Sequence, residues 1–74
     1  MDKERLINIV KRLTFNEMRV YDFDVNDEGV VVYLQNVNRD IEDKVVITRK
    51  ELIYLANEGK LKYNVLKQII IDRV

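Results

Sequence analysis

The sequence contains no cysteine, histidine, serine, proline or tryptophan. Without cysteine the chain cannot form a disulfide. Without cysteine or histidine a zinc site would rely on carboxylates alone, which suit that metal poorly. A chain of 74 residues buries a small share of its surface, and domains of this size often depend on a disulfide, a metal or a partner subunit. We therefore expect one domain spanning residues 1–74, stabilised as a homodimer.

The same absences argue against an enzyme. Histidine is the usual proton shuttle at neutral pH, and serine and cysteine are common nucleophiles. In their absence, the aliphatic hydroxyls of the chain are those of Thr14 and Thr48. Asp22 and Asp24 could act as an acid–base pair, but a domain this small offers them no deep cleft. The two glycines stand far apart, which excludes a glycine-rich phosphate loop. We predict a non-enzymatic protein without a cofactor.

Long apolar runs are also missing from the start of the chain. The segment MDKERLINIVKRL carries charges every few residues, which is unlike a signal peptide or a membrane span. We therefore expect a cytoplasmic protein that does not engage a membrane. The size and composition suit a small accessory protein of a phage or another mobile element.

Hydrophobic spacing predicts an N-terminal helix followed by strands. Apolar residues recur every three or four positions over residues 2–14, as on one face of a helix. Residues 19–25 alternate between apolar and polar side chains, residues 30–36 are almost continuously apolar, and residues 44–48 are a third, β-branched run. We predict three strands in this central part.

Two further helices are predicted after the strands. Thr48 and Glu51 have the spacing of a capping box, and Gly59 stands where a residue with positive φ ends a helix. Residues 61–74 repeat apolar side chains at helical spacing, although the run 69–71 also suits a fourth strand. The predicted fold is α+β, a single small domain of order α-β-β-β-α-α with helices on one face of a three-stranded antiparallel sheet.

The stretch DFDVNDEG has features of both a calcium loop and a hairpin turn. Oxygen-bearing side chains fill the first, third and fifth positions of an EF-hand loop: Asp22, Asp24 and Asn26. The loop also needs glycine at its sixth position and glutamate at its twelfth, where the chain has Asp27 and Tyr33. Asn26 and Gly29 instead suit the ends of a type I turn. The stretch therefore predicts a β-hairpin, with no metal site.

The expected hairpin register assigns side chains to the two faces of the sheet. With Gly29 forming a bulge, the cross-strand pairs are Val25–Val31, Phe23–Tyr33 and Tyr21–Gln35. These side chains are expected to face the helices. The opposite face would then present Val30, Val32 and Leu34 beside Asp22 and Asp24, as a docking site for a second copy or a different protein.

Charge is distributed unevenly along the chain. Residues 22–43 carry seven acids and one arginine, a net charge of −6, whereas residues 44–74 carry seven bases and three acids, a net charge of +4. The acids are Asp22, Asp24, Asp27, Glu28, Asp40, Glu42 and Asp43. Such charges often only keep strand edges soluble, but together they can also attract a basic partner.

These patterns predict a small protein-interaction module of the inhibitor or adaptor type, which engages an unknown protein partner. The residues predicted to contact that partner supply charge from the hairpin and apolar surface from the second strand: Asp22, Asp24, Asp27, Glu28, Val32 and Leu34. The alternative is a nucleic-acid-binding domain that uses the basic C-terminal helices, through Lys60, Lys62 and Lys67.

Two nucleic-acid-binding folds bear on that alternative. The order helix, three strands, helix resembles the double-stranded RNA-binding domain in topology, over most of the chain. Arg49 and Lys50 match in part the lysine cluster of that family's last helix, but the strand loop that should approach RNA is the acidic NDEG. A helix-turn-helix over residues 51–69 would put Leu55 at a usual small-residue position and Gln68 at an apolar one. The neutral net charge also disfavours nucleic acid.

Overall fold

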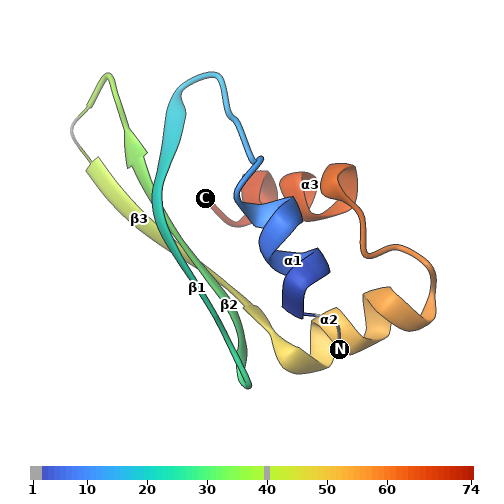
Figure 1. The fold of residues 1–74 in the computed structure, drawn as a ribbon. Coiled ribbons are helices and arrows are strands. Elements are labelled where there is room, and N and C mark those ends of the chain that lie inside the picture. The colour runs from blue at the N-terminus through green and yellow to red at the C-terminus, as the bar shows by residue number, and fades with distance from the viewer. Residues whose placement is uncertain (1–2, 40) are drawn as a thin grey trace.

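The computed structural model describes residues 3–39 and 41–74, within which it has three helices and one three-stranded antiparallel sheet. The elements in chain order are α1 (Lys3–Val10), β1 (Met18–Asn26), β2 (Gly29–Asn36), β3 (Ile41–Thr48), α2 (Arg49–Asn57) and α3 (Tyr63–Arg73). Strand β2 lies between β1 and β3, and all three helices lie on the same side of the sheet (Figure 1). The predicted α+β fold and element order are confirmed.

Helix α1 is shorter than the predicted segment 2–14, of which residue 2 lies outside the described residues. Leu6 and Val10 are its buried residues. After Val10 the backbone tightens, because the amides of Arg12 and Leu13 bond to carbonyls three residues back, at 3.2 and 3.1 Å. Leu13 therefore continues the buried stripe beyond the helix end, which explains why the apolar spacing overstated the helix length.

Helix α2 begins and ends where the sequence predicts. The Thr48 hydroxyl accepts a hydrogen bond from the amide of Glu51 at 3.3 Å. At the other end Gly59 has φ of 68°, its amide bonds to the Ala56 carbonyl, and the amide of Lys60 bonds to the Leu55 carbonyl at 2.7 Å. This pair of bonds is a Schellman motif, which satisfies the last carbonyls of the helix.

Helix α3 resolves the question of the apolar run 69–71. The segment forms a helix in which Leu66 and Ile70 are buried while Ile71 is exposed, so it supplies no fourth strand. The helices cover one face of the sheet, and the core lies between them (Figure 1). Its sheet residues are Val30, Val32, Leu34, Val45 and Ile47, and its other residues are Leu6, Val10, Leu13, Leu52, Leu55, Leu61, Leu66 and Ile70.

The hairpin is present, but its register differs by one residue from the prediction. Asn26 pairs with Gly29 across a two-residue loop, so Val25 lies opposite Val30 and Phe23 opposite Val32. A shift of one residue moves a whole strand's side chains to the other face. The prediction that Val30, Val32 and Leu34 lie on the uncovered face was therefore wrong, because they pack against the helices.

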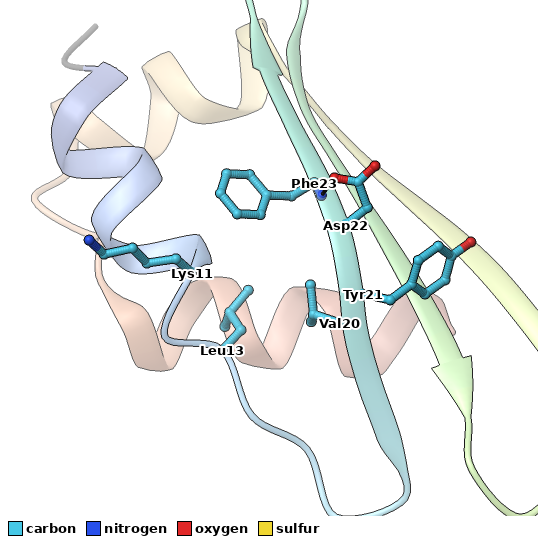
Figure 2. A pocket seen from close by; sticks show the side chains of 6 residues that line it. All are labelled: Lys11, Leu13, Val20, Tyr21, Asp22 and Phe23. Atoms are coloured by element: carbon cyan, nitrogen blue, oxygen red, sulfur yellow. Dashed lines mark hydrogen bonds between the residues drawn. The ribbon is translucent and has the colours of Figure 1, made fainter.

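A bulge in β1 causes the second difference. The register shifts between Val20 and Asp22, which leaves Tyr21 as the extra residue. Val20 and Phe23 both pack against the core, whereas Tyr21 and Asp22 point away from the helices (Figure 2). The prediction that Tyr21 faces the helices was therefore also wrong.

Candidate docking face

The side of the sheet opposite the helices carries no helix among the described residues (Figure 1). We call this side the open face. The strand register assigns to it Arg19, Asp22 and Asp24 with the bulged Tyr21 from β1, Val31, Tyr33 and Gln35 from β2, and Glu42, Lys44 and Val46 from β3. Tyr21 and Val46 are exposed by 44% and 43%, which is substantial for large apolar side chains.

An aromatic pair occupies the open face. The rings of Tyr21 and Tyr33 have centroids 6.1 Å apart and are tilted by 44°, within the range of favourable aromatic contacts. Partial desolvation and the negative charges of Glu42 and Asp22 raise the pKa of Tyr21 above its ordinary value. The Tyr21 hydroxyl is therefore neutral at physiological pH and available to donate a hydrogen bond.

Charged residues flank this apolar centre on both edge strands. The register places Asp22, Tyr33 and Lys44 in one row across the sheet, and Arg19, Gln35 and Glu42 in another. A third row contains Asp24, Val31 and Val46. Within residues 3–39 and 41–74 the salt bridges are Lys3–Asp27 and Glu51–Arg73, so the charged side chains of the open face have no salt-bridge partner among these residues.

The hairpin tip is tied to the helices. The Asp27 carboxylate contacts the Lys3 Nζ at 3.0 Å, and this hydrogen bond and the lysine charge lower the pKa of Asp27. The Glu28 amide donates to Oδ1 of Asn26 at 2.8 Å, and the Glu28 carbonyl accepts from the Arg49 amide at 2.8 Å. The tip is therefore held by the start of α1 and the start of α2.

The predicted contact residues thus divide into three groups. Asp22 and Asp24 are exposed on the open face, and Asp27 and Glu28 are exposed at the hairpin tip. Val32 and Leu34 have exposed fractions of 0% and 1%, so the expectation that they offer apolar contact is wrong. Asp40 of the predicted acidic cluster lies outside the described residues.

Sequence reasoning missed the residues that do form the apolar part of the open face, Val31, Tyr33 and Val46. A signal for them was present in β3. Lys44 and Thr48 flank Val45 and Ile47, and pairing Val45 and Ile47 with Val32 and Val30 collects β-branched side chains on one face. A hairpin with a two-residue loop has the register that allows this pairing.

On each edge strand of the sheet, a side chain forms a hydrogen bond with one backbone group of that strand. On β1 the Phe23 amide donates to Oδ1 of Asp22 at 2.9 Å. On β3 the Val46 carbonyl accepts from Nη1 of Arg73 at 2.8 Å. Engaged edge groups disfavour the addition of another strand. Phe23 on β1 and Val46 on β3 each have one edge group that is engaged in this way.

A shallow hollow of about 210 Å³ lies beside the β1 bulge. Its lining residues are Lys11, Leu13, Val20, Tyr21, Asp22 and Phe23. Figure 2 shows Leu13, Val20 and Phe23 filling the space between α1 and β1, with Tyr21 and Asp22 on the other side of the strand. The charged residues that line the hollow are Lys11 and Asp22, which lie on opposite sides of β1 (Figure 2). Its lining residues do not pair a nucleophile with a base.

Comparison of the chain with protein-family models, curated proteins and solved structures gave no match. None of the helices in the described part of the chain combines the length and apolar character needed to cross a membrane. Within the same residues, the acidic side chains form no cluster of three or more that could hold a metal ion.

Proposed function

We propose that the chain is a small non-enzymatic protein-interaction module, of the inhibitor or adaptor type, that docks on a protein through its open face. The observation that carries this proposal is that helices cover one face of the sheet and leave the other face open. One face is buried under three helices, while the other exposes Tyr21 and Val46 around the Tyr33 ring. Tyrosines surrounded by charged residues are typical of interface centres.

The acidic residues add electrostatic attraction to this surface. Asp22 and Asp24 lie on the open face itself, beside the aromatic pair. Glu28 lies at the hairpin tip, next to Asp27, whose charge is already compensated by Lys3. We therefore assign the recognition of basic groups on a partner to Asp22 and Asp24, ahead of the hairpin tip.

The basic C-terminal helices offer weaker support for nucleic-acid binding. The ammonium group of Lys67 lies 5.8 Å from the ring centroids of both Phe15 and Tyr63, so it packs against aromatic side chains of the same chain. Binding of RNA or DNA that falls steeply with added salt, and that is lost in a Lys60→Glu/Lys62→Glu variant, would replace the protein-interaction proposal.

The proposal is tested by placing a charge on the open face. Val46→Asp should abolish capture of the protein partner from cells that produce the chain, because a buried unpaired carboxylate opposes docking. Ile53→Asp is the matched control, since Ile53 is exposed by 41% on helix α2. Both variants should keep the far-ultraviolet circular dichroism of the native chain. Equal capture by the two variants would contradict the proposal.

A further inference from the structure

The open face has a charge pattern that matches itself. Across the sheet, the row through Tyr33 runs from Asp22 on β1 to Lys44 on β3. The row through Gln35 runs in the opposite sense, from Arg19 on β1 to Glu42 on β3. Each row therefore carries opposite charges at its two ends, with β2 between them.

We infer that the protein recognised by the open face is a second copy of this chain, in a two-fold dimer that stacks sheet on sheet. This inference rests on the proposed function and names its partner. A two-fold axis nearly parallel to β2 lays β1 of one copy over β3 of the other. Asp22 then meets Lys44 of the second copy, Arg19 meets Glu42, and both contacts occur twice because the interface is isologous.

The charges and the central tyrosine together select this orientation among the two-fold alternatives. An axis perpendicular to the strands and midway between the two rows would pair Asp22 with Arg19 and Lys44 with Glu42, but it would place each Tyr33 over Gln35 of the second copy. An axis perpendicular to the strands, through the row of Tyr33, would place Asp22 over Asp22 and Lys44 over Lys44 of the second copy. Like charges in that arrangement repel, whereas the axis along β2 pairs opposite charges in both of these rows and lays Asp24 over Val46 of the second copy in the third row. It also brings the Tyr33 side chains of the two copies together at the centre, where the packed faces of two sheets are about 10 Å apart.

The size of the open face sets the strength of this dimer. Eight-residue strands rise about 3.3 Å per residue and lie about 4.8 Å apart, so three of them cover roughly 26 by 14 Å. That area of about 370 Å² is below the ~800 Å² per partner of a standard interface. We expect a reversible dimer that dissociates on dilution, with a dissociation constant between about 10 μM and 1 mM.

Charge reversal tests the arrangement directly. Asp22→Lys places two lysines at each contact with Lys44, and Lys44→Glu places two acids there, so each variant alone should self-associate at least about fivefold more weakly. When the two variants are mixed, every contact again joins opposite charges. Sedimentation velocity from about 10 μM to about 1 mM should show stronger association of the mixture than of either variant alone.

Matched controls separate this effect from net charge and from folding. Glu58→Lys and Lys60→Glu make the same charge changes on exposed residues of the helical side, and should leave self-association unchanged. Circular dichroism verifies that each variant is folded. If Asp22→Lys fails to fold, Arg19→Glu mixed with Glu42→Arg applies the same test to the second row.

Three outcomes would overturn the inference: a native chain that stays monomeric up to about 1 mM, association that the reversals do not weaken, or a mixture that behaves as its components do. A monomeric chain that still captures a foreign protein, with capture lost in Val46→Asp, would overturn the second-copy inference and leave the proposed function intact. A monomeric chain that captures a foreign protein equally well with and without Val46→Asp would overturn both the second-copy inference and the proposed function.

Discussion

The backbone at Gly29 passes so close to the backbone at Ile47 that a Cβ atom on Gly29 would lie 2.2 Å from the Ile47 carbonyl oxygen. Gly29 also has φ of 136°, a conformation that residues with a side chain rarely adopt. This contact joins the start of β2 to the end of β3, where helix α2 begins. The hairpin turn, the third strand and the second helix therefore depend on one position.

Replacing Gly29 by alanine should destabilise the protein by about 2–4 kcal/mol, because the substitution adds both backbone strain and a steric clash. Urea denaturation measures the loss. Gly59→Ala is the control, since Gly59 has φ of 68° and a Cβ atom added there would meet no heavy atom within 4 Å. It should cost about 1–2 kcal/mol. Equal losses at the two glycines would contradict the close approach of Gly29.

The hairpin register predicts opposite sensitivities for neighbouring residues of β2. Leu34→Ala should lower the free energy of unfolding by about 2–5 kcal/mol, because it leaves a cavity between the sheet and the helices. Val31→Ala should lower the free energy of unfolding by less than about 1.5 kcal/mol, because the Val31 side chain lies on the open face and is only half-buried. Chemical denaturation of the two variants measures the difference. A larger loss for Val31→Ala would restore the register with Val31 and Tyr33 in the core.

Acid should weaken the contact between α2 and α3. The hydrogen bond from Arg73 lowers the pKa of Glu51 from its ordinary 4.5, although partial desolvation opposes the shift. A carboxyl whose pKa is lower in the folded state stabilises the protein fully above its unfolded pKa. That stabilisation is lost as the pH falls through the folded pKa.

The measurement is the melting temperature of the native chain and of Glu51→Gln between pH 6 and pH 3. The native chain should be the more stable at pH 6, and the two should converge as the pH drops. Glu58→Gln removes an exposed carboxylate that forms no salt bridge within the described residues, and should follow the native curve. A constant gap between the native chain and Glu51→Gln would contradict the ion pair.

Two tyrosines should titrate on opposite sides of the ordinary value of 10.0. The Thr14 hydroxyl forms a hydrogen bond with the Tyr63 hydroxyl and the Thr14 amide donates to it, and these bonds lower the pKa of Tyr63. Desolvation and nearby acids raise that of Tyr21. In an ultraviolet absorbance titration Tyr63→Phe should remove an early part of the curve and Tyr21→Phe a late part. The reverse order would contradict the described environments of both rings.

Much of the fold follows from local sequence signals. Thr48 and Gly59 predict both ends of α2, because a cap and a left-handed residue act on backbone groups within a few positions. Helical spacing predicts α3, and its ambiguity over residues 69–71 disappears only when Leu66 and Ile70 pack together in the core. The end of α1 was misplaced because Leu13 is buried without being helical.

Of the residues predicted for the open face, the acidic ones lie there and the apolar ones do not. Asp22 and Asp24 lie on the open face as expected, because period-2 alternation assigns them to the side opposite Phe23. Val32 and Leu34 were placed on the wrong side, because the hairpin loop is one residue shorter than expected. The Tyr21 bulge was not predicted, although the sequence carries a mark of it, because the apolar alternation changes phase from Met18 and Val20 to Phe23 and Val25.

The sequence by itself determined the secondary structure and its order, because caps, turn residues and hydrophobic periodicity act over a few neighbouring residues. Tertiary structure decided which face of β2 is buried. Val30, Val32 and Leu34 on one side compete with Val31 and Tyr33 on the other, and both sets are apolar enough to enter a core. Val45 and Ile47 extend the first set across the sheet, so the helices cover that side and leave the half-buried Tyr33, with its flanking charges, on the open face.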